Sequence, residues 1–170
     1  YGLIQEGKLT FDKSQNDDKV LTYHDSCNVA RASRMGTRPG GQFDIPRAII
    51  REVCNHFYDM DEETIRDRTF CCGGGGGLLT DDLMELRVKG AKPRVEALNN
   101  VMSEKGVTHM AAICAICKSQ FTQVLPFYGM DMEQIVSVHQ LVSNAIVLTP
   151  GDDDEEPEEE DESDDADARG

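Results

Sequence analysis

Five of the six cysteines in this chain fall into three groups that lie far apart in the sequence. Cys27 stands alone, Cys71 and Cys72 are adjacent, and Cys114 and Cys117 form a Cys-x-x-Cys pair. Adjacent and Cys-x-x-Cys spacings are typical of metal ligands and redox thiols. Disulfide scaffolds, by contrast, occur mainly in small secreted domains that are dense in cysteine. The pattern therefore predicts a metal or redox site built from several loops.

The adjacent cysteines favour an iron–sulfur cluster over a single metal ion. Neighbouring side chains in an extended backbone point in different directions, so Cys71 and Cys72 suit two metal atoms better than one. A structural zinc site uses four ligands, usually from two Cys-x-x-Cys-like pairs, whereas five cysteines fall into this pattern. Zinc stays open as the alternative metal. A thiol–disulfide exchange enzyme using Cys114 and Cys117 is a weaker hypothesis, because it leaves the other three cysteines without a role.

The segments that carry the cysteines add two features. Cys117 falls at an expected helix start, where free N–H groups and the charge of Lys118 favour the thiolate form that binds metal. Five glycines, Gly73 to Gly77, follow the adjacent cysteines. A backbone without side chains can approach a bulky cofactor closely or adopt positive φ, although a flexible turn is the alternative. The run lacks the Lys-Ser/Thr of a phosphate-binding loop.

Several histidines and arginines are candidates for supporting roles. His24 lies three residues before Cys27 and could donate a hydrogen bond to sulfur, relay a proton, or be a packed structural residue. Arg31 and Arg34 could offset cluster charge or be solvated loop residues. The remaining candidates are expected outside the site, with His109 and His139 as packing residues, His56 at the surface and Cys54 as a buried structural thiol.

The strand and helix patterns put the cysteines at strand ends. Residues 20–24 and 107–113 have the apolar, β-branched composition of strands and lead into Cys27 and Cys114. Apolar residues at helical spacing, with Pro and Gly as breakers, predict the remaining elements. We expect five helices, over 44–57, from 81 to a break at Gly90, from Pro93 to Gly106, over 118–125 and over 135–146. For the last of these, a strand is the alternative. We also expect a short strand over 9–11 and a loop over 31–41. The order predicts an α/β fold whose loops carry the cysteines.

Charge is concentrated at one end of the chain. The formal charge is −15 over 170 residues, and residues 151–170 hold thirteen Asp or Glu and one Arg, which leaves only −3 for residues 1–150. A near-neutral body with an acidic tail argues against nucleic acid as a partner. The tail has no large apolar residue and is expected to be disordered. No apolar run approaches the roughly 20 residues that cross a bilayer, and the start at Tyr1 suggests a fragment of a longer chain.

Three stretches together resemble a known family. The stretches are TYHDSCNVAR around Cys27, FCCGGGGG around Cys71 and Cys72, and CAICKSQF around Cys114 and Cys117. They resemble the cysteine-rich CCG domain of heterodisulfide reductase subunits, and most closely the DsrK-like branch, whose members are catalytic subunits of the membrane complex associated with dissimilatory sulfite reduction. The resemblance runs over residues 1–148. It implies a CCG iron–sulfur domain over residues 1–150, followed by the acidic tail.

The resemblance also implies a cofactor and a reaction. A non-cubane [4Fe–4S] cluster would be held by the five cysteines, with Gly73 and Gly74 beside it. It would pass electrons from a membrane complex with a quinol-oxidising, cytochrome b-type subunit to a disulfide or trisulfide of a DsrC-like sulfur-carrier protein. The location implied is cytoplasmic, attached to the membrane through partner subunits. Ferredoxin-type cysteine runs expected upstream are absent, and an electron-relay or zinc-bound interaction module without its own catalysis is the alternative.

Overall fold

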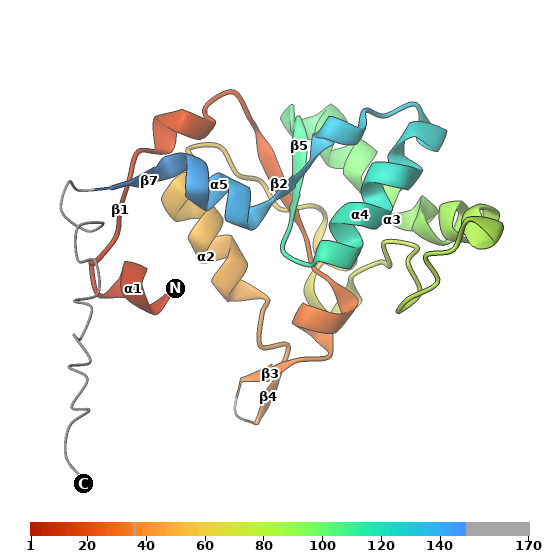
Figure 1. Ribbon diagram of the computed structural model, residues 1–170, viewed down its shortest axis with the longest axis horizontal. Coiled ribbons are helices and arrows are strands. Elements are labelled where there is room, and N and C mark those ends of the chain that lie inside the picture. The colour runs from red at the N-terminus through yellow and green to blue at the C-terminus, as the bar shows by residue number, and fades with distance from the viewer. Residues whose placement is uncertain (36, 149–170) are drawn as a thin grey trace, which may run out of the picture.

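A three-stranded parallel sheet lies at the centre of the computed structural model, which describes residues 1–35 and 37–148 (Figure 1). Strand β5 (His109–Ala112) is in the middle, between β2 (Leu21–His24) and β6 (Ile135–Ser137). In the register of the sheet, His24 pairs with Ala112 and Ala112 pairs with Ser137. Because the strands are parallel, their carboxyl ends meet at one edge, where the segments that follow β2 and β5 begin.

Helices cover both faces of this sheet, as a parallel sheet requires. Helices α2 (Asp44–Val53) and α5 (Val138–Ala145) lie on one side, and α3 (Met84–Lys105) and α4 (Ala115–Val124) lie on the other (Figure 1). Alternate strand residues therefore enter two separate cores. The first core takes Leu21, Tyr23, Ala111 and Val136, and the second takes Met110, Ala112 and Ile135. The α/β fold expected from the sequence is confirmed.

Shorter elements complete the described chain. Two small antiparallel sheets pair β1 with β7 and β3 with β4. The strands of these sheets are β1 (Thr10–Phe11), β3 (Arg34–Met35), β4 (Arg38–Pro39) and β7 (Ile146–Val147). The short helices are α1 (Gly2–Gln5), the π-helix η2 (Cys27–Arg31) and six 3-10 helices, η1 (Lys13–Asn16), η3 (Glu62–Thr64), η4 (Arg66–Arg68), η5 (Asp81–Leu83), η6 (Leu125–Tyr128) and η7 (Met132–Gln134). Among the described residues, no helix combines the length and apolar character needed to span a bilayer. The predicted tail over 151–170 lies outside these residues.

Helix α3 differs from the two helices expected there. It continues through both Gly90 and Pro93 to Lys105, and Gly106 then caps it with φ +68°. An internal proline costs about 3 kcal/mol, because it removes an N–H and crowds the preceding turn. Buried residues at spacings of three and four continue along the whole helix, so packing against the sheet outweighs that cost. The buried set is Arg87, Ala91, Arg94, Val95, Ala97, Leu98 and Val101.

Three other expectations need smaller corrections. Helix α2 ends at Val53 rather than 57, because Cys54 is extended and Leu21 pairs with Phe57 in an isolated bridge. The segment 135–146 is strand first and helix afterwards, so both alternatives hold in part. The expected loop over 31–41 contains the end of the π-helix η2 and the β3–β4 hairpin. The end of α2 is set by a tertiary pairing that local patterns do not encode, between Phe57 and the distant Leu21.

A buried ion pair joins the end of β2 to the rest of the domain. The Asp25 carboxylate accepts hydrogen bonds from Arg47 Nη1 and Nη2, both at 2.7 Å, and from the Arg66 backbone N–H at 2.8 Å. The Asp25 carbonyl oxygen accepts the Thr69 hydroxyl at 2.7 Å. Arg47 also donates to Asp59 at 2.8 Å. Asp25 therefore connects the segment before Cys27 to α2 and to the segment before Cys71.

We expect Asp25→Asn to destabilise the domain by about 3–5 kcal/mol, because it leaves the Arg47 guanidinium buried without its main counter-charge. The free energy of unfolding from urea titration measures this. Asp44→Asn is the matched control, since Asp44 pairs with Arg66 at 2.6 Å on the surface, where ion pairs contribute little. Equal losses of unfolding free energy in the two variants would show that the buried pair contributes no more to stability than the surface pair.

Gly73 lies directly against helix α3. A Cβ atom built at Gly73 would be 2.2 Å from the Arg87 carbonyl oxygen and 3.0 Å from the Ala91 nitrogen, and Gly73 has φ +90°. A Cβ at Gly90 would be 3.4 Å from the Gly73 Cα. The two glycines thus let the loop after Cys72 approach the backbone of the helix. This close approach, rather than a helix break, is the role of Gly90.

Gly73→Ala is expected to lower the free energy of unfolding by about 1–3 kcal/mol more than Gly106→Ala does. Both positions have positive φ, so they share the backbone strain, but a Cβ at Gly106 would meet nothing within 4 Å. Chemical unfolding of the two variants separates the collision from the strain. Similar losses would mean that the loop can move away from α3 at no cost.

Candidate functional site

The carboxyl edge of the sheet brings Cys27 and the Cys114–Cys117 pair to the same place. Cys27 opens η2, and the Ser26 hydroxyl caps that turn by accepting the Val29 N–H at 3.0 Å. Cys114 is the N-cap of α4, and Cys117 lies buried in its first turn. The prediction that Cys117 falls at a helix start is confirmed. Cys114, Ile116 and Cys117 of this first turn border the cavity described below, so the positive end of the helix dipole favours negative charge there.

Four of the five predicted ligands border one cavity. The cavity has a volume of about 70 Å³, several times the roughly 10–15 Å³ that a single water needs. Its walls are formed by Ser26, Cys27, Asn28, Cys72, Gly74, Gly75, Gly76, Cys114, Ile116 and Cys117. Within residues 1–35 and 37–148, no three Cys, His, Asp or Glu side chains are grouped closely enough to hold one metal ion.

The adjacent cysteines differ in exposure, as expected for neighbouring side chains. Cys71 is exposed and accepts the Gly73 N–H at 3.3 Å, whereas Cys72 is buried and faces the cavity. Hydrogen bonding to Cys72 raises the pKa of the Cys71 thiol well above its ordinary value. Hydrogen bonding to Cys117, together with burial, raises the pKa of Cys72 to about 12. These neighbouring thiols retain their protons at neutral pH, so metal binding would have to release them.

The glycine run forms one wall of the cavity. Gly75 and Gly76 have φ of +51° and +70°, in the left-handed region that favours glycine. A Cβ at Gly74 would lie 3.4 Å from Cys72 Sγ and 3.5 Å from Ile116 Cγ2. Side chains here would fill the space beside the sulfur atoms. The run is therefore a shaped wall, which supports the close-approach hypothesis over the flexible turn.

Buried polar atoms close to the cysteines have no hydrogen-bond partner in the part of the chain that the structure describes. They are both ring nitrogens of His24, Nε of Arg94 and Nε2 of Gln120. Gln120 lies one turn after Cys117, and its Nε2 is 3.0 Å from the Cβ position of Gly73. Unpaired buried donors are costly and call for an acceptor. Together with soft thiolate ligands, these donors fit an anionic group that contains sulfur.

His24 has a specific environment. Its ring is fully buried and meets Phe121 edge to face, with the ring centroids 4.9 Å apart. Burial, and then the positive charge of Arg94, hold the pKa of His24 well below 6.5. The imidazole is therefore neutral at neutral pH. It does not border the cavity itself.

Two buried arginines near the site were missed from the sequence. Arg87 and Arg94 are both 0% exposed, whereas Arg31 and Arg34, which the sequence suggested, are exposed. Their spacing was the signal that could have found them. Arg87 and Arg94 continue the stripe of Ala91, Leu98 and Val101 at steps of three and four, which is the buried face of a helix.

The residues expected outside the site mostly lie as predicted. Cys54 is buried, and burial raises the pKa of its thiol to about 11. His56 is exposed, as expected. His139 is also exposed, and the prediction that it packs in the interior is wrong, because it falls on the outer face of α5. His109 is half-buried, and Lys118 is half-buried on α4 with its N–H donated to the Cys114 carbonyl at 3.0 Å.

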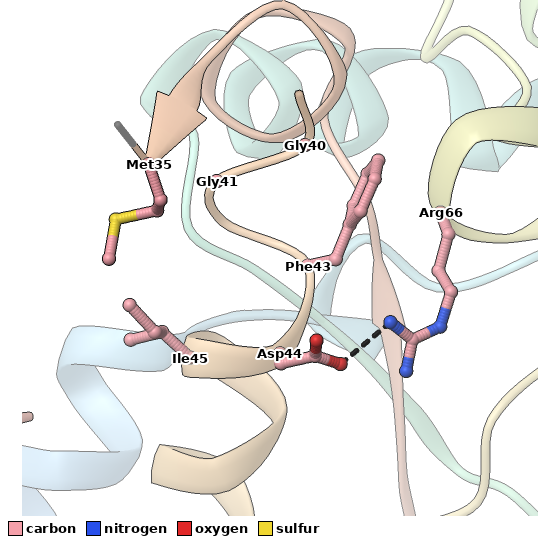
Figure 2. A pocket seen from close by; sticks show the side chains of 7 residues that line it. All are labelled: Met35, Gly40, Gly41, Phe43, Asp44, Ile45 and Arg66. Atoms are coloured by element: carbon pink, nitrogen blue, oxygen red, sulfur yellow. Dashed lines mark hydrogen bonds and ion pairs between the residues drawn. The ribbon is translucent and has the colours of Figure 1, made fainter. Parts of the chain in front are cut away.

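A second cavity lies beside the β3–β4 hairpin and the start of α2, with a volume of about 270 Å³. Figure 2 shows its lining, in which the Asp44 carboxylate and the Arg66 guanidinium point toward one another and pair at 2.6 Å. Both side chains are substantially exposed, so their charges are paired and hydrated. Among the described residues that line it there is no cysteine. This second cavity therefore offers none of the thiol ligands that border the first one.

Comparison with known proteins identifies the family of this chain. The cysteine-rich domain family, CCG, matches residues 21–122. The "Hdr-like menaquinol oxidoreductase iron-sulfur subunit 2" of Archaeoglobus fulgidus is 44% identical over 147 residues, which cover 86% of this chain and 25% of that protein. A subunit of the "Dihydromethanophenazine:CoB--CoM heterodisulfide reductase" of Methanosarcina acetivorans is 27% identical, over 86% of this chain and 32% of that protein.

A "Probable membrane-anchored ferredoxin" of Chromohalobacter salexigens is 26% identical over 87% of this chain and 20% of its own length. No solved structure matches. The chain thus spans about a quarter of the length of the Archaeoglobus relatives. Because the family match covers more than half of the chain, and a relative 44% identical covers most of it, this protein belongs to the family of cysteine-rich CCG domains.

Proposed function

We propose that this chain is the cluster-bearing domain of an iron–sulfur oxidoreductase. In this proposal the domain occupies residues 1–150 and holds one non-cubane [4Fe–4S] cluster. Its ligands are Cys27, Cys71, Cys72, Cys114 and Cys117. The observation that carries the proposal is the cavity at the carboxyl edge of the sheet, which four cysteines from three distant segments border together.

The donor set supports iron and sulfide. Thiolates are the ligands of iron–sulfur clusters, whereas a closed zinc site takes four. Cys71 is exposed and is hydrogen-bonded to the buried Cys72, so the thiols extend from the cavity to the surface. Such a spread of thiols suits a cluster of several metal atoms. The unpaired donors of Gln120 and Arg94 could then hydrogen-bond to its sulfur atoms.

The proposed reaction is the reduction of a disulfide or trisulfide of a DsrC-like sulfur-carrier protein. A cluster held by these cysteines would supply electrons one at a time, and its iron would offer a binding position for a substrate sulfur. Two electrons and two protons cleave one S–S bond, so that a disulfide gives two thiols and a trisulfide gives one thiol and one persulfide. Exposed Cys71, Gly75 and Gly76 leave the cysteine site open to a partner from solvent. The Methanosarcina relative is named as a subunit of a heterodisulfide reductase, which supports a disulfide as the acceptor.

The proposed electron source is a membrane complex with a quinol-oxidising, cytochrome b-type subunit. The Archaeoglobus relatives are named as menaquinol oxidoreductase subunits, which supports such a source. The domain would then lie on the cytoplasmic side of the membrane, held by partner subunits. An electron-relay module differs from this proposal in one respect, because its cluster would not respond to a sulfur substrate.

Anaerobically purified protein is expected to contain about four iron and four acid-labile sulfide per chain. Its oxidised form should give a paramagnetic EPR signal, and a thiol or persulfide ligand should change that signal, because substrate sulfur binds at the cluster. Metal and sulfide analysis with EPR measures both. Stoichiometric zinc without sulfide would replace the proposal with a zinc-bound interaction module. An unchanged EPR signal would replace it with an electron relay.

Cys27→Ala should lose most of the iron, the sulfide and the visible chromophore, since Cys27 is the only ligand that the segment after β2 supplies. Cys54→Ala is the matched control, because Cys54 is a buried cysteine in the opposite core and borders no part of the cavity. It should keep the cluster. Full retention of thiol–disulfide exchange activity by Cys27→Ala, with no chromophore in either protein, would favour a Cys114–Cys117 exchange enzyme.

In the proposal, His24 is a neutral, buried residue behind the cysteine site rather than a proton relay. Its folded-state pKa is depressed, so the unfolded chain binds one more proton than the folded chain once pH falls below about 6.5. The stability present above this pH should be lost as pH decreases, by about 1.4 kcal/mol per pH unit. Urea unfolding of apoprotein between about pH 5 and 7 tests this slope. His24→Phe should lack it and His56→Gln should keep it, whereas an unchanged slope in His24→Phe would contradict the assignment.

A further inference from the structure

Helix α3 buries two positive charges near the cysteines. Arg87 and Arg94 are 0% exposed, and neither has a carboxylate oxygen within 4.0 Å among the described residues. Arg47 is the instructive contrast, because it is equally buried but is neutralised by Asp25 and Asp59. Burial of an unpaired charge is unfavourable. The unpaired arginines of α3 therefore call for an anion that lies elsewhere in the site.

Arg94 is surrounded by neutral groups. Its guanidinium donates to the Thr64 carbonyl, to the Thr69 hydroxyl at 2.9 Å and to Met60 Sδ at 2.9 Å, and Nε has no partner among the described residues. It also lies 5.7 Å from the centroid of the Phe70 ring. These contacts orient the guanidinium but do not balance its charge.

The segment that Arg94 contacts leads directly into the cysteine site. Thr69 and Phe70, which contact Arg94, immediately precede the adjacent cysteines. Burial lowers the pKa of Arg94 to about 10, while the charges of Asp25 and Cys117 oppose that shift. Arg94 therefore stays protonated at neutral pH. Asp25 is already held by the two guanidinium nitrogens of Arg47. The remaining place for negative charge is the cysteine site, whose thiols would lose their protons on binding metal.

Arg87 approaches the same region through a neighbour. Its Nε donates to Gln120 Oε1 at 2.9 Å, and its Nη2 donates to Gln123. Gln120 is thereby held with its unpaired Nε2 beside Gly73. Arg87 thus acts on the glycine loop through Gln120. Arg94 contacts the segment that precedes Cys71 itself, without an intervening side chain.

We propose that Arg94 is a positioning residue that supplies the internal counter-charge of the cysteine site and so raises the reduction potential of the group held there. This inference rests on the proposed function. Reduction takes one electron from an external reductant and adds one negative charge to the site, with no proton transfer. A fixed positive charge in a buried, low-dielectric location stabilises that added charge. Loss of Arg94 should therefore make the site harder to reduce.

The test is an EPR-monitored redox titration of cluster-loaded protein, with dithionite as reductant, for the wild type and four variants. Arg94→Met and Arg94→Gln remove the charge, and Arg94→Lys keeps it. Lys92→Met removes one charge from the exposed face of the same helix. We expect the neutral Arg94 variants to change the one-electron equilibrium at least tenfold toward the oxidised form, a shift of about 59 mV to more negative potential. Arg94→Lys and Lys92→Met should stay close to the wild type.

Each alternative result has a defined meaning. Neutral variants that load the cluster and keep the wild-type potential overturn the role of Arg94. A shift of the same size in Arg94→Lys also overturns it, because charge is then not the cause. If Arg94→Lys is the only Arg94 variant that assembles the cluster, and it has the wild-type potential, the result supports the need for a positive charge at position 94. If no Arg94 variant assembles it, packing rather than charge is required and the inference fails. Wild-type protein without iron and sulfide overturns the proposed function, and this inference with it.

Discussion

The buried contact between Asp25 and Arg47 is the constraint on which the arrangement of the cysteines depends. Asp25 ends the segment that leaves β2, two residues before Cys27, and its side chain and carbonyl together hold α2, the Arg66 N–H and the Thr69 hydroxyl. The Cys71–Cys72 pair comes two residues after Thr69. One residue therefore sets the separation between two of the three cysteine groups, and β2–β5 pairing sets the third. A buried ion pair contributes less to net stability than to the uniqueness of such an arrangement, which is our hypothesis for its role here.

Helix α3 supplies the second constraint, from the opposite face of the sheet. Its backbone at Arg87 and Ala91 is in close approach to Gly73, and its buried side carries both unpaired arginines. The position of the glycine loop and the position of the positive charges are thus set by one rigid element. A helix that ended at Gly90 would separate them. Continuity through Pro93 has a structural consequence, because it keeps Arg94 in register with Arg87 two turns away.

Local patterns predicted much of this molecule, and tertiary contacts explain what they missed. Short stretches of sequence were enough to predict strands β2 and β5 and the helix start at Cys114, because their composition is typical of those elements. The grouping of cysteines at strand ends followed from these elements. The continuity of α3 depends on packing along its whole length, which no single Gly or Pro reveals. His139 was misplaced because its apolar neighbours suggested burial without indicating which face of α5 meets the sheet. The buried arginines were missed because arginine is normally a surface residue, although their spacing followed the apolar stripe.

The three arginines that are buried among the described residues divide into two kinds, and the difference matters for a site that changes charge. Arg47 is matched by Asp25 and Asp59, so its field is largely cancelled near the cysteines. Arg87 and Arg94 are held only by neutral oxygen and sulfur atoms of the described residues, which fix their positions but leave their charges unbalanced. In a low-dielectric interior, an uncancelled charge acts over longer distances than at the surface. The same fold therefore uses one arginine to fix geometry and has two others available to stabilise negative charge at the cysteines.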